Sequence, residues 1–179
     1  MSIKKWKTLS KKTVYDKKHL RIREDIVELP SKARIEYNFI ELSTIVGVIP
    51  MTKNNKILMI RQYRYPVDRI SLEIPAGYVE KGEVIRRAAV RETEEEIGYR
   101  PRKLRKITAF QPLPGRTNLE VHIFLASDLK KTQTNFDEGE FIEILEVDKK
   151  KALDYIVNGK ITHATSVIGI LCAHEKGLI

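Results

Sequence analysis

The sequence predicts an α+β fold in which helices cover a sheet, with a small antiparallel β-sheet at the N-terminus. Segments rich in β-branched and aromatic residues dominate residues 13–65 and recur over 103–147. Helical patterns occupy residues 83–97 and 150–177. Strands in the middle with helices around them indicate a layered α+β arrangement.

The N-terminal sheet is expected to contain three strands, with a Pro-Ser-Lys turn between the last two. These strands are residues 13–16, 19–29 and 33–42. Two further strands, 43–51 and 56–65, are separated by Lys53, Asn54 and Asn55, which are typical of a hairpin loop. The segment 71–77 contains a short strand that should stop at Pro75.

A helix is expected from about Glu83 to Ile97, because Gly98 stands where a left-handed residue ends a helix. The remaining elements alternate between strands and helices. The strands are residues 103–110, 119–127 and 140–147, and the helices are 150–160 and 162–177. We divide the 179 residues into an N-terminal β domain, 1–43, and a second domain, 44–179.

The net charge of +9 is concentrated near the N-terminus, since residues 1–36 hold 11 Lys or Arg against 5 Asp or Glu. Such a segment can steer an anionic small molecule or contact nucleic acid, although a solvated surface is the preferred explanation. No apolar run reaches ~18 residues, and the N-terminus lacks a secretory pattern. The single cysteine, Cys172, forms no internal disulfide, so we expect a reducing cytoplasmic location.

The predicted helix over 83–97 is unusual because it concentrates acidic side chains. Glu92 and Glu96 lie one turn apart and within ~40° of each other, and Glu95 can pair with Arg91 at i,i+4. The opposite stripe suits packing on a sheet and consists of Ala89, Val90, Thr93 and Ile97. Either the acidic side is solvated, or its carboxylates hold a hard divalent cation such as Mg²⁺.

The turn before this helix favours the metal site. The stretch from Gly77 to Tyr99 fits the pattern G-x5-E-x7-R-E-U-x-E-E-x-G-U, where U is a bulky apolar residue. The fixed positions are Gly77, Glu83, Arg91, Glu92, Glu95, Glu96 and Gly98. This stretch resembles the Nudix box of the Nudix hydrolase family, and the resemblance covers roughly residues 44–179. Thr93 departs from the aliphatic residue usual at the first U, which weakens helix packing slightly.

The resemblance implies an α/β/α sandwich with a mixed sheet that cleaves a nucleoside diphosphate linked to a further group. It also implies a divalent cofactor, Mg²⁺ or alternatively Mn²⁺, held by Glu92, Glu96 and the backbone carbonyl of Ala76. Glu95 and Arg91 then belong to the catalytic set, with Arg91 orienting Glu95.

Two segments resemble the ADP-ribose pyrophosphatase branch of the family. One is the loop QPLPGRTN, with Pro114 and Gly115, although Leu113 and Asn118 differ from residues common there. The other is IRQYRYPVDRISLEIPAG, which leads into the box. The acidic loop FDEGE resembles that branch's Glu-x-Glu loop, which implies that Glu138 is the general base and Glu140 an additional metal ligand.

Substrate contacts follow from the same resemblance. Arg64 is the preferred phosphate ligand because a guanidinium binds phosphate through two N–H groups, with Arg61 and Arg116 as alternatives. Trp6 and Tyr37 are assigned to stacking on adenine across a homodimer. The other assigned positions are Glu73, Pro114, Gly115 and Arg116.

The sequence therefore predicts a cytoplasmic, Mg²⁺-dependent ADP-ribose diphosphatase that yields AMP and ribose 5-phosphate and forms a homodimer. Two alternatives remain: a diphosphatase for another nucleoside diphosphate sugar, and a non-catalytic nucleotide- or RNA-binding module. The intact set of Glu92, Glu95 and Glu96 disfavours the binding module, which makes nucleic acid an unlikely partner, and no membrane contact is expected.

Overall fold

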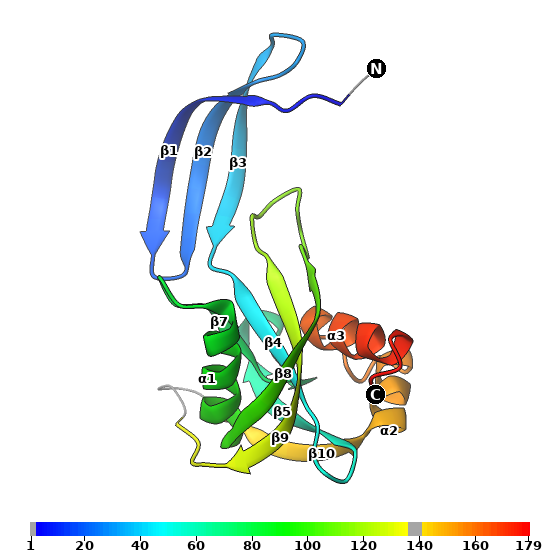
Figure 1. Cartoon of the computed structure of the whole chain (residues 1–179). Helices are drawn as coiled ribbons and strands as arrows, with labels where there is room; N and C mark the ends of the chain where they lie inside the picture. The colour runs from blue at the N-terminus through cyan, green and yellow to red at the C-terminus, as the bar shows by residue number, and fades with distance from the viewer. Residues whose placement is uncertain (1–2, 136–140) are drawn as a thin grey trace. The chain divides into compact units, whose positions relative to one another are not determined.

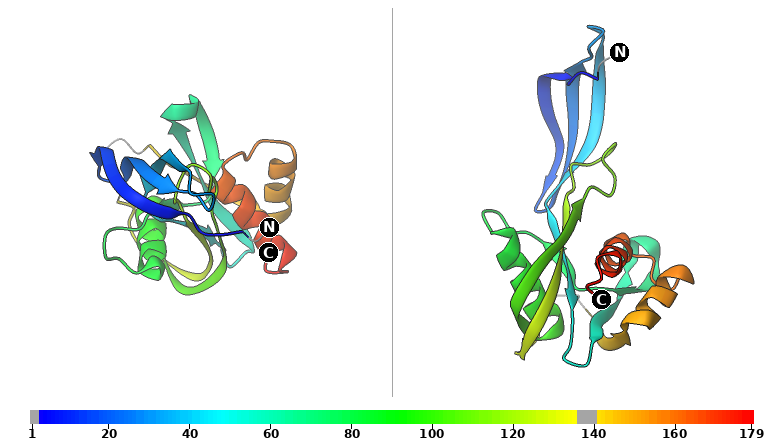
Figure 2. Two further views of the ribbon diagram at one scale, coloured as in Figure 1. Left: turned by 90° about the horizontal axis from the view of Figure 1, so that it is seen from above. Right: turned by 45° about the vertical axis from the view of Figure 1, so that its right-hand side comes forward.

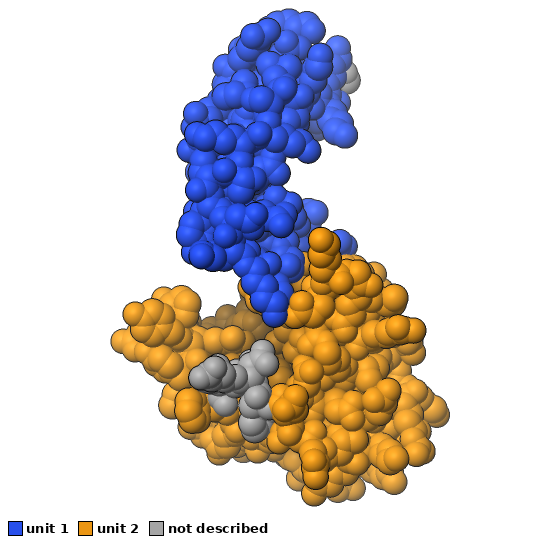
Figure 3. Space-filling model, turned by 90° about the vertical axis from the view of Figure 1, so that its left-hand side faces the viewer, with its two compact units in different colours: residues 1–43, 111–120 blue, residues 44–110, 121–179 orange. Residues whose placement is uncertain are grey.

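The computed structural model describes residues 3–135 and 141–179 and divides into two compact units, drawn in blue and orange in Figure 3. The first unit is Met1–Ser43 with Gln111–Glu120, and the second is Thr44–Phe110 with Val121–Ile179. The loop Gln111–Glu120 thus groups with the N-terminal unit, whereas the sequence analysis placed it in the second domain. The assignment of separate roles to the two domains stays a prediction.

The first unit is a three-stranded antiparallel sheet in the order β1-β2-β3 (Figure 1). Its strands are β1 (Lys7–Lys17), β2 (Leu20–Glu28) and β3 (Arg34–Leu42). The loop Gln111–Glu120 is tied to β3, because Ile40 donates its backbone N–H to the carbonyl of Arg116 (2.8 Å). Leu42 likewise donates to the side-chain oxygen of Asn118 (2.8 Å). The predicted antiparallel N-terminal sheet is confirmed.

The second unit contains two sheets. A mixed sheet has the order β7-β4-β9-β8, in which only the β4–β9 pair is parallel. Its strands are β4 (Ile45–Pro50), β7 (Ala76–Tyr78), β8 (Tyr99–Phe110) and β9 (Val121–Lys131). An antiparallel sheet has the order β10-β5-β6. It contains β5 (Lys56–Arg64), β6 (Arg69–Glu73) and β10 (Glu143–Asp148), with a short 3-10 helix, η1 (Tyr65–Val67), between β5 and β6.

Helices α1 (Ile85–Ile97) and α3 (Ala164–Glu175) lie on opposite sides of the mixed sheet, as the right-hand view of Figure 2 shows. Val46 and Val48 of β4 pack with Ala88 and Ala89 of α1. On the other face of β4, Gly47 lies so close to α3 that a Cβ there would meet the methyl group of Thr165. The third helix, α2 (Lys149–Val157), contacts β10, β5 and α3. Helix, sheet and helix form the predicted sandwich.

The predicted hairpin around Lys53–Asn55 is wrong in its pairing. A tight turn does form there, with Thr52 donating its backbone N–H to the carbonyl of Lys56 (2.8 Å). The strands on either side nevertheless enter different sheets and share one isolated bridge, Met51 with Ile57. β4 pairs instead with β9 along Ile45–Pro50 and with β7 at Ile45–Gly47.

Several boundaries also differ from the prediction. The short strand expected to stop at Pro75 is β6, which ends two residues earlier, at Glu73; the additional strand β7, which begins at Ala76 in the other sheet, was not expected. α1 begins at Ile85, because Glu83 belongs to the preceding turn and bonds the backbone N–H of Glu80 (3.0 Å). β8 begins directly after Gly98, whose φ of 67° reverses the chain as predicted.

Candidate active site

The acidic residues of α1 face the turn formed by β7. Glu96 is only 4% exposed, and its carboxylate accepts the backbone N–H of Ala76 (2.9 Å). Glu92, one turn earlier, is 9% exposed and lies against Gly77, where a Cβ would overlap its carboxylate. Glu92 and Glu96 are therefore buried rather than part of a solvated face, and their assignment as metal ligands stays a prediction.

Gly77 is required here for space. Its φ lies outside the left-handed region that favours glycine, so an alanine is compatible with the backbone. The obstacle is the Glu92 carboxylate, which fills the volume that a methyl group would need. The first fixed glycine of the motif thus allows a buried carboxylate to approach the β7 backbone.

Arg91 connects the carboxylates of the site. Its guanidinium donates to Glu92 (2.6 Å), to Glu95 at the predicted i,i+4 spacing (2.9 Å), and through two nitrogens to Glu83 (3.0 and 3.1 Å). It also donates to the carbonyl of Tyr78 in β7 (2.8 Å). The hydrogen bond with Glu83, together with Glu92 and Glu95, raises the pKa of Arg91 further above its ordinary range. The same bond holds the pKa of Glu83 below its usual value.

The packing side of α1 is close to the predicted stripe. Ala89, Thr93 and Ile97 are buried, while Val90 is half-buried. Thr93 replaces the aliphatic residue usual in the motif, and its hydroxyl donates to the carbonyl of Ala89 (2.6 Å). Because this bond satisfies the hydroxyl inside the helix, the buried threonine leaves no unpaired polar atom.

The donor set suits a hard divalent cation. Two buried carboxylates converge on the Ala76–Gly77 turn, and Mg²⁺ takes carboxylate and carbonyl oxygens as ligands. Among residues 3–135 and 141–179, no three His, Cys, Asp or Glu side chains form a ready-made metal cluster. The predicted base Glu138 and predicted ligand Glu140 lie outside the described residues.

Arg64 and Glu73 form a fork-like pair in the second unit. The Nε and Nη2 groups of Arg64 donate to the two carboxylate oxygens of Glu73 (2.9 and 2.6 Å). Glu73 is 1% exposed, whereas the Arg64 side chain retains 39% exposure. Arg61, the alternative phosphate ligand, instead pairs with Glu143 at the surface (3.3 Å).

The predicted adenine-binding residues lie together in the first unit. The rings of Trp6 and Tyr37 meet edge to face at 5.8 Å, and the Tyr37 hydroxyl donates to the carbonyl of Gly115 (3.0 Å). Tyr37, Pro114 and Arg116 line a pocket of about 480 Å³ in this unit. The structure thus brings five predicted residues into one region, although no ligand contact is observed for any of them.

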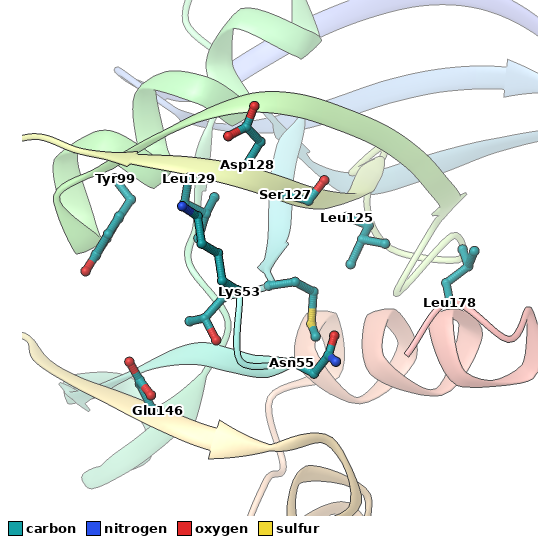
Figure 4. Close-up of a pocket in the computed structure, with 11 residues that line it drawn as sticks. Lys53, Asn55, Tyr99, Leu125, Ser127, Asp128, Leu129, Glu146 and Leu178 are labelled. Atoms are coloured by element: carbon teal, nitrogen blue, oxygen red, sulfur yellow. The ribbon is translucent and has the colours of Figure 1, made fainter.

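Two further pockets lie in the second unit. One, of about 980 Å³, follows the outer side of α1 and is lined by Arg87, Arg91 and Glu95 among others. The other, of about 530 Å³, is shown in Figure 4, where Lys53, Tyr99 and Glu146 approach it from different strands and loops. Its lining residues, all within the described chain, include none of the predicted site residues. It shares Tyr99, the last position of the box, with the motif but contains none of the charged residues of the box.

Comparison with known proteins identifies the family. A family model described as the NUDIX domain matches residues 42–163, and one described as the nucleoside diphosphate sugar hydrolase N-terminal domain matches residues 6–39. The chain belongs to the Nudix hydrolase family. Among its Nudix relatives is an ADP-ribose pyrophosphatase of Bacillus subtilis, 37% identical over 166 residues, which are 92% of this chain and 90% of the relative.

Another relative has a different name, and a solved structure has a similar fold. A methanol dehydrogenase activator of Bacillus methanolicus is 34% identical, with the same coverage of 92% and 90%. A solved structure described as an ADP compounds hydrolase has a TM-score of 0.87 over the whole of both chains at 20% identity. That similarity confirms the fold. In the part of this Nudix chain that the structure describes, no helix is long and apolar enough to cross a bilayer.

We expect Gly77→Ala to lower the free energy of unfolding by ~1–3 kcal/mol, because the added methyl group overpacks against Glu92. Turnover should fall as well, since the displaced carboxylate belongs to the Nudix box. Urea unfolding measures the first effect. The matched test is a double-mutant cycle with Glu92→Ala, in which the stability penalty should shrink to within ~0.5 kcal/mol. An equal penalty in both backgrounds would show that Glu92 is not the obstacle.

The sequence assigned no chemistry to His163, yet its ring lies beside Glu73, at 3.4 Å, and Ser166, at 2.9 Å. Glu73 comes from β6, whereas His163 and Ser166 lie three residues apart at the start of α3, so no local spacing connects Glu73 to the other two. In the sequence, His163 is marked only by its place in the polar pair Thr162-His163 directly before an apolar helix, and such a pair ordinarily indicates the start of a helix.

Proposed function

We propose that this Nudix chain hydrolyses the diphosphate of ADP-ribose to AMP and ribose 5-phosphate, with Mg²⁺ or a similar divalent cation as cofactor. The observation that carries the proposal is the pair of buried carboxylates, Glu92 and Glu96, held against the Ala76–Gly77 turn. Relatives named ADP-ribose pyrophosphatase, at 37% identity in Bacillus subtilis and 24% in Mycobacterium tuberculosis, support this choice of substrate.

In this proposal Glu92, Glu96 and the carbonyl of Ala76 hold the cation, and Glu140 adds a further oxygen. When bound there, a divalent cation neutralises charge on a diphosphate and activates water. Arg91 keeps Glu92 and Glu95 oriented through the bonds described above. A carboxylate pair one turn apart is otherwise repulsive, so a cation between them also relieves strain in α1.

Glu138 is proposed as the general base. Asn135 donates its backbone N–H to the carbonyl of Glu95 in α1 (3.0 Å), so the chain entering the acidic loop is anchored at the box. A general base must reach the water that it deprotonates, and the resemblance of the FDEGE segment to the Glu-x-Glu loop of the ADP-ribose pyrophosphatase branch supports Glu138 for this role.

Arg64 is proposed to hold a phosphate of the substrate. The side chain of Arg64 is held by the two-point contact with Glu73 and remains partly exposed. Trp6 and Tyr37 are proposed to bind adenine, with Pro114, Gly115 and Arg116 forming the adjoining loop. The pocket of about 480 Å³ beside Tyr37 supports this assignment.

We also propose a homodimer in the cytoplasm. On the sheet face opposite Tyr37, the side chains of Tyr15, Ile22 and Ile40 lie in register and are exposed. A second copy of the chain would bury this apolar face, as unpartnered apolar patches commonly require. The single cysteine, Cys172, fits a reducing compartment because it has no internal disulfide partner.

The direct experiment is a phosphate-release screen, in which nucleoside diphosphate compounds are incubated with protein and a phosphatase, with and without Mg²⁺. Cation-dependent release from ADP-ribose supports the proposal. Preference for another nucleoside diphosphate sugar would correct the substrate. Absence of release with every compound would favour the binding module instead.

We expect Trp6→Ala to weaken ADP-ribose binding by ~1–3 kcal/mol, the usual loss when an aromatic ring no longer stacks on a base. Trp6→Phe should retain most of the affinity because it keeps a ring. The measurements are KM and sedimentation. Deletion of residues 1–43 should abolish the dimer as well as raise KM. If KM and the dimer are both unchanged in Trp6→Ala, Trp6 is a packing residue. If Trp6→Ala instead lowers an RNA affinity that depends steeply on salt, the non-catalytic RNA-binding module is favoured.

A further inference from the structure

A polar cluster at the start of α3 meets the end of β6. The Nδ1 atom of His163 lies 3.4 Å from a carboxylate oxygen of Glu73 and 2.9 Å from the hydroxyl of Ser166. The same hydroxyl accepts the backbone N–H of Ile74 (2.9 Å), which follows Glu73 in the chain. The cluster thus contacts the polypeptide two residues before the proposed metal ligand Ala76.

Hydrogen-bond chemistry determines which ring nitrogen of His163 carries the proton. Burial would raise the pKa of Glu73, but the hydrogen bonds and charge of Arg64, with His163 and Ser71, hold it below its usual range. Glu73 is therefore ionised near neutral pH and can only accept hydrogen bonds. The negative charge beside the Nδ1 atom of His163 favours the tautomer in which this nitrogen carries the proton, and that N–H then faces Glu73 and Ser166.

His163 and Arg64 act on the same carboxylate oxygen. Oε2 of Glu73 faces the Nδ1 atom of His163 at 3.4 Å and accepts from Nη2 of Arg64 at 2.6 Å, while Oε1 accepts from Nε of Arg64. A two-point fork makes the guanidinium plane follow the carboxylate plane. Whatever fixes the rotation of Glu73 therefore also fixes the direction in which Arg64 points.

We propose that His163 is a positioning residue for substrate binding, which orients the phosphate-binding Arg64 through the buried carboxylate of Glu73. This inference rests on the proposed function, in which Arg64 holds a substrate phosphate. His163 does not touch the substrate. Ser166 completes the arrangement, because its hydroxyl accepts the Ile74 N–H and also lies 2.9 Å from the Nδ1 atom of His163, and so ties the ring to the backbone directly after β6.

The ring acts in its neutral form. Burial lowers the pKa of His163, the charge of Glu73 on β6 opposes that effect, and the charge of Arg64 on β5 adds to it. Since the folded-state pKa lies below the unfolded value of about 6.5, the folded state binds fewer protons than the unfolded chain. The contribution of the neutral His163 ring to the free energy of unfolding is therefore fully present above about pH 6.5, and it is lost as the pH falls through the folded-state pKa of the ring.

The experiment compares His163→Ala with His163→Asn in the full-length protein. Asparagine places a neutral N–H donor near the position of Nδ1, and it is also a favourable residue at the N-cap that His163 occupies. His163→Ala should raise KM for ADP-ribose by about tenfold, while kcat stays within about twofold. His163→Asn should keep KM within about twofold of wild type. His174→Ala, which removes an exposed histidine from the same helix, is the control and should change neither constant.

A second arm needs no substrate. The unfolding midpoint of wild type should fall relative to that of His163→Asn as the pH drops below about 6.5, because only wild type carries the titrating ring. The inference is overturned if His163→Ala matches the control in KM, if His163→Asn shows the same KM defect as His163→Ala, or if the pH dependence of the midpoint is identical in wild type and His163→Asn. Wild-type protein that does not hydrolyse ADP-ribose would instead refute the proposed function.

Discussion

Replacing Glu96 with glutamine is expected to lower ADP-ribose turnover by on the order of 10²-fold or more, with little effect on folding. The substitution keeps the shape of the side chain and removes one negative charge. Its remaining amide oxygen can still accept the backbone N–H of Ala76, as the carboxylate does at 2.9 Å. The loss is therefore one of cation affinity at a site where charge is the dominant requirement.

Stability should be unchanged or slightly higher in Glu96→Gln. Glu92 and Glu96 are both buried and one turn apart, so neutralising one of them removes a repulsion. Glu94→Gln is the matched control, because Glu94 lies on the same helix and pairs with Arg100 outside the metal-binding turn (3.0 Å). It should leave turnover within about twofold of wild type.

Three measurements on Glu96→Gln complete the test. These are turnover across a Mg²⁺ titration, calorimetric Mg²⁺ affinity of the free protein, and the urea midpoint. Near wild-type turnover at saturating Mg²⁺, together with unchanged Mg²⁺ affinity, would remove Glu96 from the metal site.

The features of the site that sequence could predict are those set by local periodicity. Helix geometry places Arg91 and Glu95 one turn apart, and their ion pair is present (2.9 Å). A glycine at the end of an acidic helix predicts a left-handed C-terminus, and Gly98 has a φ of 67°. In both cases the relevant residues lie within one turn of each other, so no tertiary contact had to be known.

Contacts between distant segments could not be predicted in this way. The burial of Glu92 depends on how closely β7 approaches α1, and periodicity alone allowed a solvated acidic face. The Glu73–His163 contact joins residues from β6 and α3, so nothing in either segment indicates it. The turn at Lys53–Asn55 was recognisable, but its flanking strands enter different sheets, and β4 pairs with β7 and β9 instead.

The second large effect on turnover is expected from the acidic segment FDEGE, which contains Glu138 and Glu140. We expect Glu138→Gln to lower kcat by on the order of 10²-fold or more, while KM stays within a few-fold, because a general base acts in the chemical step and contributes little to binding. Cation affinity of the free protein should be unchanged, which distinguishes this variant from Glu96→Gln.

Glu140→Gln in the same loop is the paired variant, since it makes the same chemical change two residues away. Because Glu140 is a proposed metal ligand, Glu140→Gln should bind the cation more weakly than wild type. High Mg²⁺ should therefore restore part of the turnover that Glu140→Gln loses. Added Mg²⁺ should not restore the turnover of Glu138→Gln. Both positions lie outside the described residues, so the two variants, rather than geometry, distinguish the two roles. If Glu140→Gln abolishes turnover at every Mg²⁺ concentration and Glu138→Gln barely changes it, the two roles are reversed, and the base lies closer to the start of β10.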